Sequence, residues 1–227
     1  MKLFAALATL LLSVPTMAYE AGTFIVRGSV ATVSPDVSSS SLSLGGAELP
    51  GTAADVDDAS ALGLTGTYML SDHFGVEVVA ASPFSHGLEV SGLGDTISLG
   101  ETSQLPPTVL LQWYPMQPST SVQPYLGLGV NYTVFFDEEV SGAANRLFGT
   151  LGATGNADLS LENSFGLAAE AGVDMAFGAD RRWLLNLAVL WVDLDTEAKV
   201  SVPGLGNVTA DVDVDPLVTM VGLGYRF

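Results

Sequence analysis

Eight segments of this chain alternate between apolar and polar residues with a period of two, the pattern of a β-strand whose two faces meet different surroundings. In residues 23–33, for example, Phe24, Val26 and Val30 share one face while Arg27 and Ser29 share the other. The alternating segments are residues 23–33, 61–70, 74–83, 105–114, 124–136, 163–177, 183–194 and 216–227. The pattern predicts an all-β protein in which one face of each strand needs an apolar environment.

That environment is expected to be a membrane. The chain is 48% hydrophobic and 14% charged, with a mean hydropathy of +0.41, which is too apolar for a disordered protein. A membrane-spanning helix needs about 20 apolar residues, whereas the longest apolar run, residues 183–192, is interrupted by Asn186. A closed β-barrel is the other way to pair every backbone N–H and C=O group in lipid.

The N-terminus predicts export. Met1 and Lys2 precede an apolar stretch from Leu3 to Val14, and Thr16-Met17-Ala18 forms a small-x-small cleavage site. We interpret residues 1–18 as a secretory signal peptide and residues 19–227 as one barrel domain. A membrane anchor is the weaker alternative because the apolar stretch is shorter than a spanning helix requires.

The connections and the C-terminus define the fold class. Short connections at residues 71–73, 115–123 and 178–182 alternate with long ones at residues 34–60, 84–104, 137–162 and 195–215. The last segment ends on Phe227, which resembles the C-terminal signal recognised by the outer-membrane assembly machinery of Gram-negative bacteria. We predict an eight-stranded antiparallel transmembrane β-barrel with short periplasmic turns and long extracellular loops. The alternative is a soluble sandwich that ends in an edge strand.

Charge and cysteine content exclude several functions. With 25 acidic and 7 basic residues the net charge is −18, so nucleic-acid binding has no electrostatic driving force. The absence of cysteine excludes disulfides, thiolate metal sites and a lipoprotein anchor. Many acidic residues fall in the long loops, where Asp211, Asp213 and Asp215 share a strand face. We interpret them as a solvated rim beside cation-bridged lipopolysaccharide, with a divalent-cation site as the alternative.

Two layers of side chains are expected inside the barrel. Arg27, Glu77, Glu170, Asp174 and Arg226 point inward by parity, and buried charges must pair, so we predict an ion-paired network in the periplasmic half. Gln112 and Asn131 also point inward. Above the network, the apolar residues expected to form a constriction are Met69, Val79, Leu110 and Leu190.

Proline marks a weak place in the predicted wall. Proline cannot donate a hydrogen bond to its neighbour, and a closed barrel has no edge strand in which to place it. Pro106 and Pro107 begin one segment, and Pro83 ends the segment before it. We predict a lateral opening beside these three residues. The alternative is that Pro106 and Pro107 start a strand above the membrane.

Enzymatic chemistry is not expected. The two histidines, His73 and His86, fall at opposite ends of the predicted barrel, so neither forms a nucleophile–base pair with a third orienting group. We interpret His86 as a solvated loop residue, with contact to a solute in the channel as the alternative. No cofactor is implied.

Ordered motifs along the whole mature chain resemble the outer membrane protein W (OmpW/OprG) family. The matching motifs include Ala21-Gly22, Leu62-Gly63-Leu64-Thr65, Gly75-Val76-Glu77, Leu105-Pro106-Pro107-Thr108, Val130-Asn131-Tyr132-Thr133, Phe135-Phe136-Asp137 and Asp215-Pro216. The resemblance implies a non-enzymatic barrel that extends beyond the outer leaflet. It also implies passive uptake of small hydrophobic or amphipathic molecules or small amino acids, with exit sideways into the bilayer.

The residue at position 190 and the overall composition bear on the width of the constriction and on the function. Family members place a bulkier aromatic residue where Leu190 aligns, so the constriction is expected to be looser in this chain. The composition also allows a structural or receptor barrel with a closed lumen that acts through its loops.

Overall fold

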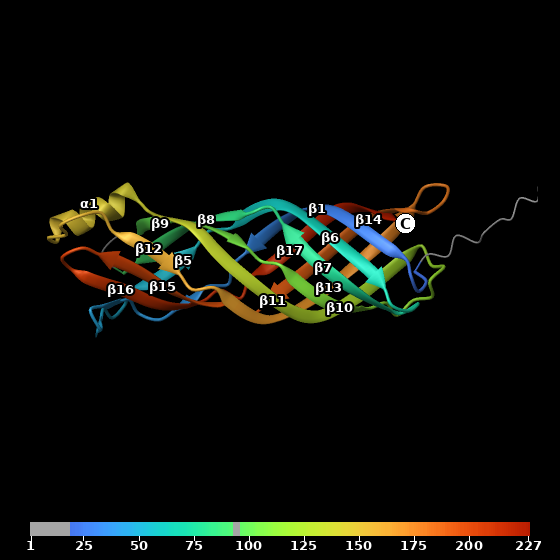
Figure 1. Cartoon of the computed structure of the whole chain (residues 1–227), viewed down its shortest axis with the longest axis horizontal. Helices are drawn as coiled ribbons and strands as arrows, with labels where there is room; N and C mark the ends of the chain where they lie inside the picture. Colours follow the sequence, from blue (N-terminus) through green and yellow to red (C-terminus); the bar gives the residue numbers. More distant parts are fainter. Residues whose placement is uncertain (1–18, 93–95) are drawn as a thin grey trace, which may run out of the picture.

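Eight strands close into one antiparallel barrel in the computed structural model, which describes residues 19–92 and 96–227. The predicted signal peptide, residues 1–18, lies outside these residues. Strand β10 pairs with β7 on one side and with β11 on the other, which closes the ring and confirms the predicted eight-stranded barrel (Figure 1). The barrel strands are β1 (Phe24–Ser34), β6 (Ala59–Met69), β7 (Phe74–Ala81), β10 (Thr108–Trp113), β11 (Val122–Val140), β13 (Ser164–Phe177), β14 (Trp183–Val192) and β17 (Leu217–Arg226).

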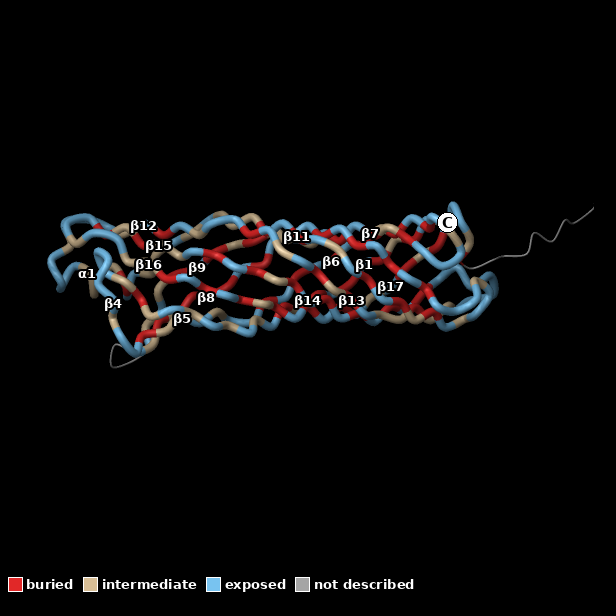
Figure 2. Tube along the Cα trace, turned by 90° about the horizontal axis from the view of Figure 1, so that it is seen from below, coloured by how far each residue is buried: buried red, intermediate tan, exposed pale blue. Residues whose placement is uncertain are grey.

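Side chains alternate between lumen and outer surface as the period of two predicts. Along β1, Ile25, Arg27 and Ala31 are buried while Phe24 and Val30 are exposed. The same alternation of buried and exposed positions follows the other barrel strands (Figure 2). The exposed face is apolar, as a barrel wall in lipid requires. Among the described residues, no helix has the length and apolar character needed to cross a membrane.

Aromatic side chains gather on the outer surface beside the C-terminus. Trp183 and Tyr225 meet edge to face with ring centroids 5.2 Å apart, and Tyr225 meets Phe227 at 4.9 Å. Phe24 lies 6.4 Å from Phe227 on the other side. Rings of this kind are typical of the membrane–water interface, and here they mark its periplasmic side.

The three short turns connect β6 to β7, β10 to β11 and β13 to β14, as predicted. At the prolines, two strand boundaries differ from prediction. Strand β10 begins at Thr108 instead of residue 105, and β7 ends at Ala81 instead of Pro83. The reason is that Pro83, Pro106 and Pro107 have no N–H to place in a ladder.

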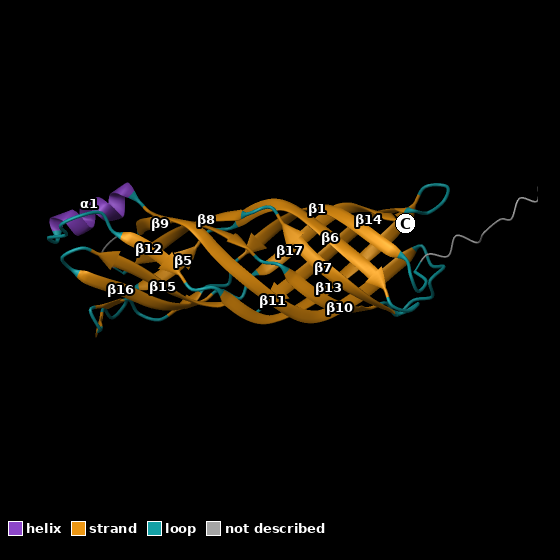
Figure 3. Cartoon of the chain, in the orientation of Figure 1, coloured by secondary structure: helices purple, strands orange, loops and turns teal. Residues whose placement is uncertain are grey.

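The predicted long extracellular connections are present, and most of their residues form sheet. They form an extension of the barrel at the end opposite the C-terminus (Figures 1 and 3). One part adds β5 (Ala53–Val56), β8 (Phe84–Ser91) and β9 (Ile97–Leu105) to the upper half of β11, and the other part contains β2 (Ser38–Ser39), β3 (Ser43–Leu44), β4 (Ala47–Glu48), β12 (Asp158–Leu161), β15 (Asp195–Val202) and β16 (Gly206–Asp213).

Even the stretch at residues 38–46, whose serine and glycine content favours turns, contributes short strands. Thr209 pairs with Ser43, and Val212 pairs with Ser39. Partners far away in sequence thus create strands where local composition favours turns. Tertiary pairing therefore overrides local preference in this part of the chain.

Helix α1 (Gly142–Thr150) lies at the outer end of the extension. Ser141 caps its N-terminus, because the Ser141 hydroxyl oxygen accepts a hydrogen bond from the Ala144 amide at 3.0 Å. The same hydroxyl donates to the Ser98 carbonyl at 2.6 Å, which ties the helix to β9.

The lipid-facing surface generates a stability prediction. Leu128 is 71% exposed on β11 within the apolar belt. Leu128→Arg should lower the free energy of unfolding in lipid vesicles by about 2–4 kcal/mol, because arginine at mid-membrane loses its hydration. Met116→Arg, in a periplasmic turn and 45% exposed, is the matched control and should cost about 0–1 kcal/mol. Equal losses in urea titrations of the two variants would contradict this placement of the membrane.

Candidate functional site

Arg27 organises a buried charge cluster in the periplasmic half of the lumen. Its Nη1 atom lies 3.0 Å from Glu77 Oε1, and its Nη2 atom lies 2.5 Å from Asp174 Oδ2. The guanidinium also donates to Thr67 Oγ1 at 2.8 Å and to the Tyr114 hydroxyl at 3.2 Å. A guanidinium bound on several sides by acceptors is held rigidly. Because its members come from β1, β6, β7 and β13, the cluster crosses the lumen.

Aromatic residues complete the cluster. The sequence patterns did not predict them as members of it. The Tyr19 hydroxyl donates to Asp174 Oδ2 at 2.7 Å, and the Tyr114 ring lies between Tyr19 and Tyr125, with centroids 5.1 and 5.3 Å away. The Arg27 guanidinium carbon lies 5.3 Å from the centroid of the Tyr125 ring. Parity along β11 places Tyr125 inside, but Tyr19 precedes the first strand, so the alternation does not orient it.

Two predicted members of the network have other surroundings. Gln112 Nε2 donates to Glu77 at 2.6 Å and to Glu170 at 2.8 Å, so Glu170 joins the cluster through an amide and not through an arginine. Arg226 is buried but has no carboxylate within ion-pair distance among the described residues. Its Nη2 atom donates to the Arg181 carbonyl at 2.9 Å. The structure therefore joins four of the five predicted residues.

The four apolar residues expected to form a constriction are all buried, but they do not form one layer. Val79 and Leu190 line the same cavity. Leu110 pairs with Glu77, next to the charge cluster. Met69 pairs with Gly75 at the periplasmic end of β6, so it lies on the other side of the cluster from Val79.

One ladder of the wall is interrupted beside the prolines. Strands β7 and β10 pair up to Val79 and Thr108, and the next pair along this seam is Phe84 with Gln104, between β8 and β9. Residues 80–83 and 105–107 in between make no ladder pairs across the seam. We call this interruption the wall gap. It contains Pro83, Pro106 and Pro107.

The wall is intact on both sides of the gap. The Tyr132 amide of β11 donates to the Pro107 carbonyl at 3.0 Å, and the Ser82 amide donates to the Leu62 carbonyl of β6 at 2.8 Å. The Pro106 carbonyl accepts from Asn131 Nδ2 at 3.2 Å and from Thr108 Oγ1 at 3.1 Å. Side chains thus satisfy a carbonyl that the ladder leaves free, which allows the gap to exist at this depth.

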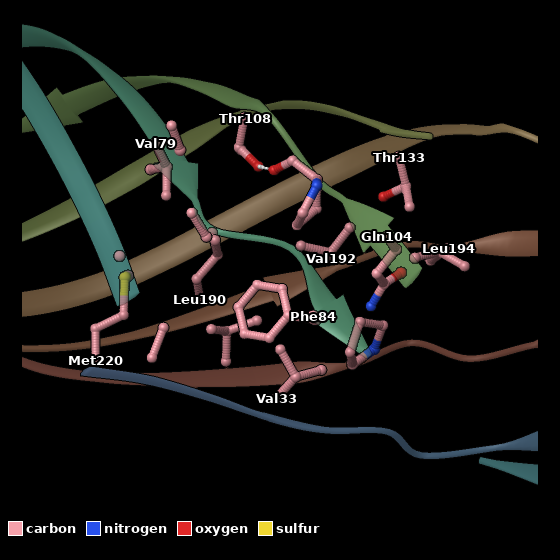
Figure 4. A pocket seen from close by; sticks show the side chains of 17 residues that line it. Val33, Val79, Phe84, Gln104, Thr108, Thr133, Leu190, Val192, Leu194 and Met220 are labelled. Atoms are coloured by element: carbon pink, nitrogen blue, oxygen red, sulfur yellow. Dashed lines mark hydrogen bonds between the residues drawn. The ribbon is translucent and has the colours of Figure 1, made fainter. Parts of the chain in front are cut away.

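A cavity of about 30 Å³ lies directly inside the wall gap (Figure 4). Ala80, Ala81 and Pro106 line it from the gap, and Ala80 is exposed on the outer face of the barrel. The labelled side chains that surround it are mostly apolar and come from several strands: Val33, Val79, Phe84, Leu190, Val192, Leu194 and Met220.

Two further cavities lie toward the outer end. A middle cavity of about 50 Å³ shares Gln104 and Leu194 with the cavity at the gap. An outer cavity of about 140 Å³ shares Leu99 with the middle one and has an entirely apolar lining, which includes Leu147 and Phe148 of α1. The three cavities therefore succeed one another from α1 to the wall gap.

His86 lines the middle cavity, so its interpretation as a solvated loop residue was wrong. It is 3% exposed and belongs to β8. Its Nδ1 atom lies 2.7 Å from the Asp57 carbonyl oxygen, and its Nε2 atom lies 2.9 Å from Gln104 Nε2. Burial lowers the pKa of His86, and this effect outweighs the opposing influence of the Asp57 carbonyl and of the Asp57 and Asp58 carboxylates.

The acidic residues of the extension that the structure describes include exposed cross-strand pairs. Within residues 19–92 and 96–227, no group of three or more carboxylates or histidines is arranged to hold a metal ion. Asp211 and Asp213 are exposed on β16, and Asp213 pairs with Asp195 across β15. Burial and the neighbouring Asp213 raise the pKa of Asp195.

Comparison with known proteins assigns the chain. A sequence model of the OmpW family matches residues 20–227. The chain belongs to the OmpW family. Outer membrane protein W of Escherichia coli K12 is 39% identical over 226 residues, covering 98% of this chain and 97% of that protein. Outer membrane protein W of Vibrio cholerae O1 is 38% identical, covering 95% of this chain and 93% of that protein.

A solved structure supports the same assignment. The crystal structure of OprG from Pseudomonas aeruginosa is 46% identical and superposes with a TM-score of 0.85, covering 93% of this chain and 98% of that one. This OmpW-family chain is accordingly an outer-membrane protein that crosses the bilayer with its strands.

The Arg27 cluster generates the second prediction. Arg27→Met leaves Glu77 and Asp174 buried without their cation, which should lower the free energy of unfolding by about 3–5 kcal/mol. Urea titration in lipid vesicles measures the loss. Arg226→Met is the control, because it removes an equally buried arginine that pairs with no carboxylate among the described residues. A similar loss in both variants would show that the ion pairs do not hold the cluster together.

The buried His86 generates a pH prediction. Its folded-state pKa lies below the unfolded value of about 6.5, so its stabilising contribution is complete above that pH and is lost as the pH falls. The melting temperature of the native protein should therefore fall between pH 7 and pH 5 by more than that of His86→Gln. Parallel melting curves for the two proteins would refute the assignment of a buried neutral imidazole.

Proposed function

We propose that this OmpW-family barrel is a passive channel that takes up small hydrophobic or amphipathic molecules, or small amino acids, and releases them sideways through the wall gap. The observation that carries the proposal is the series of apolar cavities from α1 to residues 80–83 and 105–107. Each step of the route has its own support in the geometry.

The periplasmic end favours a sideways exit. The Arg27 cluster places a guanidinium, three carboxyl groups and several tyrosines across the lumen. An apolar solute gains nothing by replacing these hydrogen bonds, and it loses its apolar contacts when it approaches them. A route along the barrel axis to the periplasm is therefore unfavourable for such a molecule.

The outer end favours entry of apolar molecules. The outer cavity, about 140 Å³ with an apolar lining, is close to the size of an apolar protein cavity known to bind benzene, about 150 Å³. Leu147 and Phe148 of helix α1, and Leu151 directly after it, line this cavity. A solute that crosses the lipopolysaccharide layer through the interior of the extension does not contact the charged surface of that layer.

The wall gap supplies the exit. Pro106 and Pro107 offer no donors to residues 80–83, so separation of the two edges breaks no ladder hydrogen bond. The exit also lies beside Ala80, which faces the outer surface of the barrel. Pro83, Pro106 and Pro107 are the residues proposed to keep this seam open, while Val79 and Leu190 form the narrow lining just inside it.

Partners of the chain follow from its position. The apolar belt contacts outer-membrane lipids, and we propose that the acidic extension lies among cation-bridged lipopolysaccharide. We also propose that the C-terminal strand ending at Phe227 is recognised by the assembly machinery of the outer membrane. The alternative function, a structural or receptor barrel with a closed lumen that acts through its loops, predicts no uptake of any solute.

Uptake measurements test the channel. Proteoliposomes with lipopolysaccharide in the outer leaflet should take up radiolabelled naphthalene faster than empty ones, and alanine uptake tests the small amino acids. Pro106→Ala with Pro107→Ala restores the backbone N–H groups of residues 106 and 107 beside the seam, which should slow naphthalene uptake several-fold.

Pro124→Ala, within β11 and away from the gap, is the matched control and should leave the rate unchanged. Equal rates in the native protein and the double variant would refute the lateral exit but not the channel. Absence of uptake by the native protein would favour the receptor alternative.

A further inference from the structure

Three polar side chains interrupt the apolar lining of the middle cavity on one side. His86, Thr102 and Gln104 lie on the inner face of the β8–β9 pair, and His86 is the direct cross-strand partner of Thr102. Their exposed fractions are 3%, 3% and 6%. The cost of burying polar groups beside an apolar passage suggests that they have a role there.

The hydrogen bonds define the protonation state of the histidine. The Asp57 carbonyl oxygen only accepts, so His86 Nδ1 carries the proton and donates to it at 2.7 Å. His86 Nε2 then accepts from the Gln104 amide at 2.9 Å. The imidazole is therefore neutral, and the Gln104 amide keeps a carbonyl oxygen that is able to accept a hydrogen bond.

The Thr102 hydroxyl is buried and has no hydrogen-bond partner in the part of the chain that the structure describes. A buried hydroxyl without a partner is costly, and it is able both to donate and to accept. Thr196, also on the cavity wall, differs because its hydroxyl donates to the Glu162 carbonyl at 2.7 Å. Of these two threonine hydroxyls on the cavity wall, the Thr102 hydroxyl is the one that lacks a partner among the described residues.

The remaining part of the cavity wall is suited to an apolar molecule. Leu88, Leu99, Phe135 and Leu161 line it, and Leu99 continues into the outer cavity. The carboxyl-bearing residues of the lining, Asp55 and Glu89, pair with each other across β5 and β8, and both have solvent exposure. No buried cation is present among the lining residues to compensate an anionic solute.

We propose that Thr102, His86 and Gln104 form a selective binding site for the uncharged hydroxyl or carbonyl head of a small amphipathic solute, whose apolar body lies against Leu99 and Phe135. The inference rests on the proposed channel function and narrows its substrate class. A pure hydrocarbon leaves Thr102 unsatisfied, whereas an alcohol, phenol or ketone supplies the missing partner.

A matched pair of ligands tests the site. 4-Fluorophenol and 4-fluorotoluene have almost the same shape. The phenol carries a hydroxyl group at the position where the toluene carries a methyl group. Binding of each to the full chain in lipid nanodiscs is measured by ¹⁹F NMR at neutral pH, with empty nanodiscs as the reference. The phenol should bind about three- to tenfold more tightly than the toluene, the ratio expected for one added hydrogen bond.

The Thr102→Val variant removes the hydroxyl while keeping the shape of the side chain, so it should abolish this ratio. Ser103→Ala is the matched control, because Ser103 lies next in β9 with its hydroxyl 3.1 Å from Ser85 on the exposed face. In the native protein, the phenol should shift the ¹⁵N resonances of the His86 imidazole. His73, in a periplasmic turn, is the internal reference and should not respond.

The outcomes are distinguishable. Equal affinities for the two ligands, or a ratio that survives Thr102→Val, would overturn the binding site while the channel stands. A ligand-induced shift at His73 instead of His86 would also overturn it. Failure of the native protein to bind either ligand would count against both the site and the channel, and the naphthalene uptake assay would then show whether transport occurs without it.

Discussion

The closed hydrogen-bonded wall is the constraint on which the rest of this structure depends. In hydrocarbon no water replaces a missing backbone partner, so each strand must pair with a neighbour on both sides. Closure through β10 and β11 fulfils that requirement with eight strands. It also fixes the inner and outer faces of every strand, because a shift of one residue would turn charged residues such as Arg27 and Asp174 toward lipid.

Within that wall the narrow lumen is divided by chemistry. A barrel of eight strands has room for side chains and little else. At the periplasmic end the space is filled by charged and aromatic groups, several of which hydrogen-bond to Arg27. Toward the outside it is lined by apolar groups that leave small cavities. The boundary between the two regions lies near the wall gap, where the ladder across the seam is interrupted beside the prolines.

The extension beyond the membrane also separates polar from apolar surroundings. Sheet continues from β11 past the gap, and β15 and β16 bring distant segments together around an apolar interior. The outer surface of this region is acidic and its interior is apolar. In the proposed channel, an apolar molecule in this interior is therefore separated from the acidic outer surface by a single layer of sheet, with α1 beside it at the outer end.

The sequence alone determined the number of membrane strands, the face of each residue and the identity of the buried charges, because a period of two is a local property of the backbone. Tertiary structure decided what each buried group meets. Glu77 and Asp174 pair with Arg27 and not with Arg226, and His86 lies inside a sheet instead of in a loop. Within the serine-rich residues 38–46, β2 and β3 form because β16, far along the chain, supplies their partners. Such contacts depend on register and on chain closure over long separations, and no local pattern records either.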